Sequence, residues 1–274
     1  MSSRNDIRTQ LGDLAHEGES LDELVAVISD EKWSLPTSSA GWTIAHQIGH
    51  LLWTDRAALL AATNPDAFVE HAMTVAAAPG AAVEAGARYN AERSPSDLLD
   101  DWRTTRKRLA AAIAAVPPGD RMPWYGPPMK ATSMATARLM ETWAHGRDVA
   151  DALGVRRSAT PRLRNIAHLG VQTRDYSFIV NETTPPVEEF RVELLSPDES
   201  ELWEWGPVAA EQTVTGPVED FCLLVTRRAH RADLRLVARG ADADAWLDRA
   251  QAFAGHPGKG RRPAGSATNL PSSM

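Results

Sequence analysis

The stretch Ala137-Arg-Leu-Met-Glu-Thr-Trp-Ala-His145 carries the most information about the architecture of this chain. Its apolar residues recur at helical spacing, and we expect a helix with Ser133 as its N-cap and Gly154 as its C-terminal stop. Glu141 and His145 stand four residues apart, so they share one face of that helix. The apolar neighbours predict that this face is buried, and the buried carboxylate and imidazole therefore need a partner.

Three more long helices are predicted upstream, at residues 6–28, 44–62 and 94–116. The first has an apolar stripe at helical spacing, Thr43 can cap the second, and a Ser-Pro pair opens the third. Residues 64–93 show a weaker pattern, with a short helix around residues 81–91. Four long helices in the first ~155 residues predict a four-helix bundle.

The pattern changes after residue 157, which we expect to end the first domain. Residues 158–256 predict a smaller α+β domain, because alternating strand patterns are interleaved with helical ones. The expected elements are a helix at 160–179, a hairpin of strands at 190–195 and 201–205, a strand at 212–215, a helix at 218–230, a strand at 234–238 and a helix at 242–253. Residues 257–274 are rich in Gly, Pro, Ser and Arg and are expected to be a disordered tail.

Composition excludes several classes of function. The chain has 274 residues and a formal net charge of -7, which disfavours a nucleic-acid or anionic-membrane binder. It has no apolar run of roughly 20 residues that could span a bilayer, and no apolar stretch follows the N-terminal charges as in a signal peptide. The single cysteine, Cys222, allows no internal disulfide. We therefore expect a cytoplasmic protein.

A divalent metal ion would satisfy Glu141 and His145 together, and His50 is the best candidate for a third ligand. It lies late in Trp42-Thr-Ile-Ala-His-Gln-Ile-Gly-His50, on the second predicted helix, and facing helices of a bundle can supply such a set. Two histidines and one carboxylate leave open positions, which is typical of catalytic sites, and suit Zn²⁺ first, with Fe²⁺ or Ni²⁺ as alternatives. His46 is either a fourth ligand, a donor behind the ligands, or a polar residue near a helix start. A Glu-x-x-x-His pair is also common on ordinary helices as a surface pair.

These two motifs resemble those of the DinB-like superfamily. The residues that carry the likeness are Trp42-Thr-Ile-Ala-x-x-Ile-x-His50-Leu and Met140-Glu-Thr-Trp-Ala-His145-Gly-Arg-Asp-Val149. Within the superfamily the chain is similar to the mycothiol-dependent maleylpyruvate isomerase group over about residues 5–255. With Asp220-Phe-Cys-Leu-Leu-Val-Thr226 included, it is most similar to an actinobacterial subgroup of predicted metal-binding proteins.

The resemblance implies both a fold and a set of ligands. It implies a DinB-like bundle, a C-terminal domain similar to sterol-carrier-protein folds, and a divalent metal held by His50, Glu141 and His145. The first motif more usually has Asp where this chain has His46, so any role of that Asp differs here.

The resemblance also implies an enzyme that uses an external low-molecular-weight thiol such as mycothiol, as an isomerase or an S-transferase. A metal lowers the pKa of a bound thiol, and the thiolate can add to an activated double bond, allow rotation and leave. Two alternatives stay open. One is a metal-dependent hydrolase or amidase that uses bound water, and the other is a non-catalytic stress protein with a closed metal site. Cys222 lies among apolar residues and is expected in the core, so the thiol would come from outside.

Several other residues have two interpretations each. Asp148 either orients a ligand or pairs with a nearby cation, and Arg138 either holds an anionic substrate group or lies on the surface. The loop 123–129, rich in Trp, Tyr and Pro, either lines the mouth of a pocket or packs. Three arginines of the second domain either reach a substrate carboxylate or favour a helix C-terminus, namely Arg227, Arg228 and Arg231.

Overall fold

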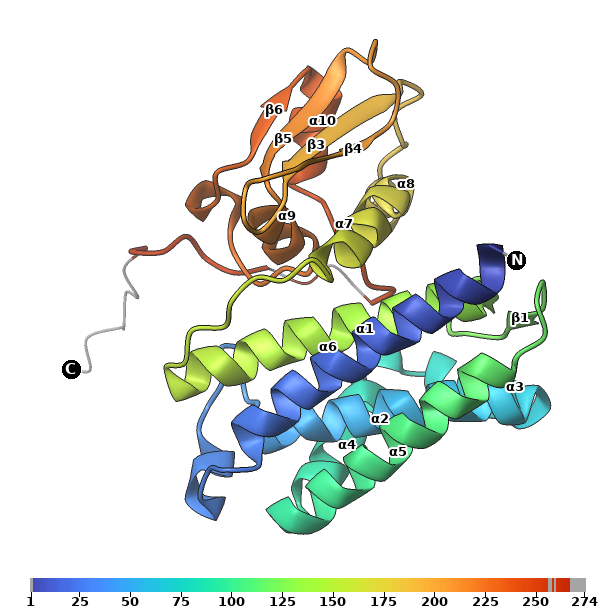
Figure 1. The fold of residues 1–274 in the computed structure, drawn as a ribbon. Helices are drawn as coiled ribbons and strands as arrows, with labels where there is room; N and C mark the ends of the chain where they lie inside the picture. Colours follow the sequence, from blue (N-terminus) through green and yellow to red (C-terminus); the bar gives the residue numbers. More distant parts are fainter. Residues whose placement is uncertain (1, 256–257, 259, 267–274) are drawn as a thin grey trace. The chain divides into compact units, whose positions relative to one another are not determined.

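The computed structural model describes residues 2–255, 258 and 260–266, and the chain forms two compact units, Met1–Ser158 and Ala159–Met274 (Figure 1). Most of the tail that we expected to be disordered, 257–274, lies outside the described residues. No helix in the described part of the chain is long and apolar enough to cross a membrane.

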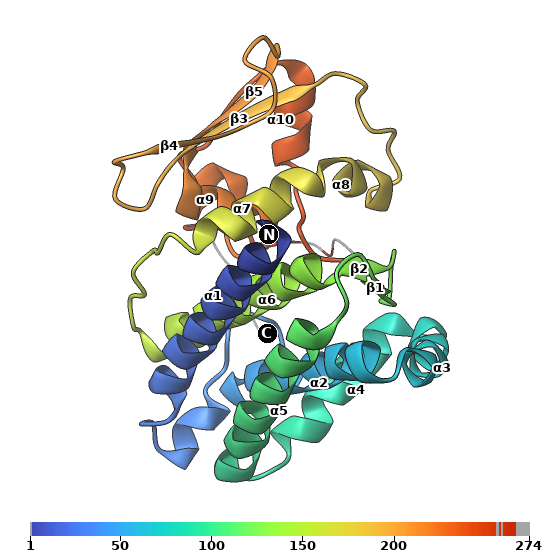
Figure 2. The same cartoon turned by 45° about the vertical axis from the view of Figure 1, so that its right-hand side comes forward.

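The first unit is the predicted bundle of four long helices with two shorter helices added. The elements of this unit are α1 (Ser2–Val25), a 3-10 turn (Asp30–Ser34), α2 (Ile44–Thr63), α3 (Pro65–Ala76), α4 (Pro79–Ala91), α5 (Pro95–Ala115), the short strands β1 (Arg121–Met122) and β2 (Met129–Lys130), and α6 (Ala131–Leu153). The helix α2 lies against α5, α4 and α6, and α1 packs along α6 (Figures 1 and 2).

The helix ends follow from local chemistry. Thr43 is the N-cap of α2, and the Ser94 hydroxyl accepts a hydrogen bond from the Asp97 backbone N–H at 3.1 Å to open α5. Gly154 ends α6 in the left-handed conformation with φ 67°, as predicted. The predicted N-cap at Ser133 is wrong, because α6 begins two residues earlier, directly after strand β2 and Lys130.

The unclear region 64–93 forms two helices instead of one short one. Asn64 opens α3, since its side chain accepts a hydrogen bond from the Ala67 N–H at 3.2 Å. Pro79 occupies the first position of α4, which separates the two helices. The helix α4 can approach α2 closely at Gly49, where an added Cβ would lie 2.6 Å from the Ala87 carbonyl oxygen.

Two apolar clusters fill the bundle. One joins α1, α2, α5 and α6, and the other gathers around Phe68 near α3 and the β1–β2 hairpin. Residues of the first include Leu21, Ile44, Ile48, Leu51, Leu52, Leu98 and Trp102. The first cluster packs between α2 and α6, and these two helices carry the predicted ligands.

The second unit is α+β, as predicted, with a four-stranded sheet in the order β4-β3-β5-β6 (Figure 1). The strands β3 and β4 form the expected antiparallel hairpin, β5 pairs parallel to β3, and β6 pairs antiparallel to β5. The elements are α7 (Leu163–Gln172), α8 (Arg174–Val180), β3 (Phe190–Leu195), β4 (Leu202–Trp205), β5 (Gln212–Pro217), α9 (Val218–Val225), a 3-10 turn (Arg231–Asp233), β6 (Val237–Arg239) and α10 (Ala241–Leu247).

Several boundaries in this unit differ from the prediction. The helix expected at 160–179 is divided at Thr173, whose hydroxyl donates to the Leu169 carbonyl at 3.0 Å. The helix expected to reach residue 230 ends at Val225, and Arg227 follows with a positive φ of 61° that no helix contains. The last predicted strand begins three residues later, at Val237–Arg239, and the helix expected to reach residue 253 ends at Leu247.

Candidate metal centre

His50, Glu141 and His145 meet inside the bundle. His50 comes from α2, while Glu141 and His145 lie one turn apart on α6. A Glu141 carboxylate oxygen, Oε2, lies 3.2 Å from His145 Nε2 and 3.5 Å from His50 Nε2. Ligand atoms of all three residues lie within 4.8 Å of one another. Both histidines are buried and Glu141 is partly exposed, so the cluster has one side open.

These distances fit a divalent cation. A tetrahedral ion with ligand bonds of about 2.0–2.2 Å separates its ligand atoms by about 3.3–3.6 Å, close to the two distances measured here. The donor set of two imidazole nitrogens and one carboxylate oxygen suits Zn²⁺, Fe²⁺ or Ni²⁺. Only three ligands converge in the described part of the chain, which would leave a position for water or substrate.

The orientation of His145 is set by a residue that sequence reasoning missed. His145 Nδ1 is hydrogen bonded to the side-chain oxygen Oε1 of Gln47, which is fully buried on α2. An amide oxygen only accepts, so His145 Nδ1 donates and the neutral ring has its lone pair on Nε2. That nitrogen faces Glu141 Oε2, so two lone pairs point at each other unless a proton or a cation lies between them. The available signal was spacing, since Gln47 is one turn from His50.

Glu141 is held in its charged form. Burial opposes ionisation, but without a metal the hydrogen bonds donated by protonated His145 and His50, together with the charge of Arg138, outweigh it, and the pKa of Glu141 lies well below its ordinary value. The carboxylate is therefore a ready anionic ligand at neutral pH.

Arg138 is buried behind Glu141, so the interpretation of a surface arginine is wrong. Its side chain is 3% exposed, and its Nη2 lies 3.9 Å from Glu141 Oε1 while Nη1 lies 3.8 Å from Asp55 Oδ1. The guanidinium also stacks on Trp124, with 5.6 Å from its central carbon to the ring centroid. Arg138 thus compensates the buried Asp55 and the partly exposed Glu141, and it approaches the Glu141 oxygen opposite the one that faces the histidines.

Asp55 is the second carboxylate of this group. It lies on α2, is 4% exposed, and accepts a hydrogen bond from Trp102 Nε1 at 3.2 Å. Burial raises the pKa of Asp55 to about 6, against the opposing attraction of Arg138. Nothing in the spacing of Asp55 pointed to this position, because the contact depends on how α2, α5 and α6 pack.

Aromatic rings surround the cluster. The ring of Trp42 lies 5.3 Å from that of His50 and 6.1 Å from that of His145, centroid to centroid. The ring of Trp53 lies 6.4 Å from that of His50 and stacks at 6.1 Å on Tyr125 of the loop 123–129. The loop 123–129 is therefore linked to His50 through the neighbouring rings of Tyr125 and Trp53. Rings at these positions shield the ligands from water and leave polar contacts to the open side.

The other candidate residues have structural partners. His46 Nδ1 lies 2.9 Å from the Thr43 hydroxyl and accepts from the Thr43 N–H at 3.4 Å, which closes the first turn of α2. His46 is thus absent from the ligand cluster. Asp148 is fully buried and accepts hydrogen bonds from the hydroxyls of Ser38 and Ser39, which anchors their loop to α6.

In the second unit, Cys222 is fully buried as predicted, and burial raises the pKa of its thiol well above the ordinary value. Arg231 forms ion pairs with Asp244 of α10 and with Asp248, the residue that follows this helix. Arg227 donates to the Arg249 carbonyl and Arg228 to the Thr226 carbonyl. These contacts are local to the second unit.

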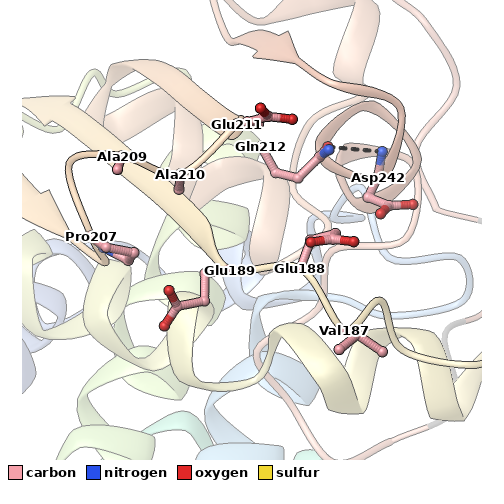
Figure 3. A pocket seen from close by; sticks show the side chains of 9 residues that line it. All are labelled: Val187, Glu188, Glu189, Pro207, Ala209, Ala210, Glu211, Gln212 and Asp242. Carbon is pink, nitrogen blue, oxygen red and sulfur yellow. Dashed lines mark hydrogen bonds between the residues drawn. The ribbon is translucent and has the colours of Figure 1, made fainter.

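A pocket of about 500 Å³ also lies in the second unit (Figure 3). Its side chains come mostly from the segments before β3 and β5, and four of them are carboxylates: Glu188, Glu189, Glu211 and Asp242. Gln212 in its wall is already used, because its Oε1 accepts from the Asp242 and Ala243 N–H groups. No imidazole or thiol lines the pocket, so its residues offer no nucleophile or metal-ligand set like that of the bundle.

The comparisons with known proteins agree with this architecture. Residues 14–150 match the family model described as mycothiol maleylpyruvate isomerase N-terminal domain, and residues 186–239 match one described as wyosine base formation. Two crystal structures of the mycothiol-dependent maleylpyruvate isomerase, one of them a mutant, are similar, with TM-scores of 0.55 and 0.56 at 16% and 15% identity. Each alignment covers 85% of this chain and 92% of that one, which shows the fold.

Relatives also occur among curated sequences. Two uncharacterized proteins, from two strains of Mycobacterium tuberculosis, are each 58% identical over 251 residues. The alignments cover 92% of this chain and 97% of each relative. The predicted fold class, a DinB-like four-helix bundle followed by a smaller α+β unit, is confirmed. The chain therefore belongs to the mycothiol maleylpyruvate isomerase N-terminal domain family of the DinB-like superfamily.

Proposed function

We propose that this chain is a metal-dependent enzyme that uses an external low-molecular-weight thiol, such as mycothiol, as an isomerase or S-transferase on a small molecule. The observation that carries the proposal is the convergence of His50, Glu141 and His145, with Glu141 Oε2 within 3.5 Å of a nitrogen of each histidine. Family membership supports the thiol, because the solved relatives are described as mycothiol-dependent.

A divalent cation bound by these three residues would lower the pKa of a coordinated thiol, making it a nucleophile at neutral pH. The chain's own residues supply the rest. Glu141 stays ionised and contributes the negative charge, and His145 presents Nε2 because its Nδ1 is hydrogen bonded to Gln47. Trp42 and Trp53 flank His50 and limit access of water from two sides.

In the isomerase reaction, the thiolate sulfur would form a bond to one carbon of an activated double bond, and the electron pair would move onto the activating carbonyl. Rotation about the resulting single bond and expulsion of the same thiolate restore the double bond with the opposite geometry. In an S-transfer, a proton is added instead and the sulfur stays on the product.

Metal analysis followed by thiol titration tests this proposal. Purified protein should contain about one equivalent of divalent metal, and the cobalt-substituted form should change its visible spectrum when mycothiol is added. Glu141→Ala should lose the metal while circular dichroism shows an intact fold. Asp151→Ala is the matched control, because Asp151 lies on the same helix with a side chain that is 55% exposed. A wild-type protein that binds no divalent metal contradicts the proposal.

Turnover assays with and without added thiol distinguish a thiol-dependent enzyme from a hydrolase. Thiol-dependent turnover of an activated cis double bond is the expected result. Hydrolysis of an amide or of a thiol conjugate without added thiol would instead identify the metal-dependent hydrolase. A spectrum that does not respond to mycothiol, together with no turnover, would contradict the thiol-dependent enzyme.

A further inference from the structure

We propose that Thr37 and Gln47 are positioning residues that determine which ring nitrogen of His145 faces the candidate metal centre. This inference rests on the proposed function, because it assigns Thr37 and Gln47 a role in preparing a metal ligand. The two residues form a chain of hydrogen bonds with a fixed direction, which begins at the backbone of Trp42 and ends at His145.

The direction of the chain follows from its first link. The Thr37 hydroxyl donates its only proton to the Trp42 carbonyl oxygen, with 2.9 Å between the oxygens. Toward Gln47 the hydroxyl can therefore only accept, so the Gln47 atom that lies 2.8 Å from it is the amide nitrogen Nε2. An amide side chain has its oxygen opposite its nitrogen, and this places Oε1 against His145 Nδ1.

The last link sets the imidazole. Because Gln47 Oε1 has no proton to give, His145 Nδ1 must carry a hydrogen, and in the neutral ring it is Nε2 that has the lone pair. Nε2 faces Glu141 Oε2, 3.2 Å away, so either a proton or a cation must lie between the two atoms. A metal binds imidazole through an unprotonated nitrogen, so the chain prepares His145 as a ligand before any ion arrives.

The first residue of the chain is held by its own loop. The Thr37 backbone N–H also donates to the Trp42 carbonyl, at 2.8 Å, and Pro36 forms a β-bridge with Thr43. The loop thus joins the start of α2 and keeps the Thr37 hydroxyl against Gln47. Gln47 is fully buried, so no water competes for either end of its amide. A residue 108 positions before His145 in sequence therefore acts on its ring through Gln47.

Three variants test the chain with a readout that does not depend on activity. Long-range proton–nitrogen NMR of the metal-free protein, at a pH high enough that the His145 ring is neutral, reports the tautomer of His145 directly. We expect Nδ1–H in the wild type and in Gln47→Glu, whose carboxylate also accepts from Nδ1. Gln47→Leu should give a mixture of tautomers, and Thr37→Val should do the same, because the freed amide can turn its nitrogen toward His145.

Metal affinity is the second readout. Loss of the partner behind a ligating histidine typically weakens metal binding about 10–100-fold, and we expect this for Gln47→Leu, with a smaller loss for Thr37→Val and near-wild-type affinity for Gln47→Glu. Ser38→Ala is the matched control in the same loop, because the Ser38 hydroxyl bonds Asp148 and not Gln47. It should keep the wild-type tautomer and affinity. Circular dichroism and the melting temperature verify that each variant is folded.

The outcomes separate this inference from the proposed function. A wild-type protein that binds no metal refutes the proposed function, while the NMR measurement of the His145 tautomer still tests the chain of hydrogen bonds. Folded Gln47→Leu and Thr37→Val proteins that keep the Nδ1–H tautomer overturn the inference, even if the wild type binds metal. Wild-type His145 with its hydrogen on Nε2 overturns it as well.

Discussion

Replacing Asp55 with Asn should change how the stability of the bundle depends on pH. Asp55 is buried and accepts a hydrogen bond from Trp102, while Arg138 approaches its other oxygen at 3.8 Å. Burial is the largest influence and raises the pKa of Asp55 from its ordinary 3.8 to about 6. Asn keeps the size of the side chain and its acceptor for Trp102 but has no proton to lose.

The sign and size follow from linkage. Between pH 3.8 and about 6 the folded state binds the Asp55 proton more tightly than the unfolded state does, so stability from this group is present below 3.8 and is lost as pH rises through 6. A shift of about 2 units at about 1.4 kcal/mol per unit amounts to about 3 kcal/mol in total. About 2 kcal/mol of this should be lost between pH 4.5 and pH 8.

Urea denaturation of metal-free protein across that pH range, followed by circular dichroism, measures the effect. The free energy of unfolding of Asp55→Asn should rise by about 2 kcal/mol relative to wild type between pH 4.5 and pH 8. Asp22→Asn is the control of opposite sign. Burial opposes ionisation of Asp22, but its bonds to Arg103 and Arg106 outweigh burial and lower its pKa. The Asp22→Asn variant should be less stable than wild type by a constant amount between pH 4.5 and pH 8, and the difference should shrink only when pH falls below 3.8 through that lowered pKa. A constant difference between wild type and Asp55→Asn across the range would refute the reasoning.

Three further predictions concern packing and charge. Gly49→Ala should destabilise the bundle by about 1–3 kcal/mol, because the new methyl group would lie 2.6 Å from a backbone oxygen of α4. Gly12→Ala, whose methyl group would meet nothing within 4 Å, should be neutral or stabilising. Equal melting temperatures of the two variants would contradict this. Arg138→Met should lower the free energy of unfolding by about 3–5 kcal/mol, because Asp55 and Glu141 lose the charge that compensates them. Adding Asp55→Asn to this variant should recover part of that loss. A strictly additive double-mutant cycle would disprove the coupling. Cys222 should resist alkylation in the native protein and react once urea unfolds it, because burial keeps the thiol protonated; rapid native labelling, followed by mass spectrometry, would show otherwise.

Much of the architecture is contained in local sequence patterns. The spacing of apolar residues and the residues at the helix ends predicted four long helices, and the structure has them at α1, α2, α5 and α6. The strands at 190–195 and 201–205 were predicted with their hairpin pairing from alternation and from the turn residues at 197–200 between them. Helix spacing likewise placed Glu141 and His145 on one face, because residues four apart on a helix are neighbours whatever surrounds them.

Other features depended on how distant segments pack. Asp55 carries no local signal of its role, and Gln47 carries only its spacing of one turn from His50, since each acts on a residue of α6 that lies more than eighty positions away in sequence. The burial of Arg138 was missed for the same reason, because a single helix cannot show whether a neighbouring helix covers its charged face. Spacing along one helix therefore determined two of the candidate ligands, whereas the bundle's packing alone decided the hydrogen bonds and charges that prepare them.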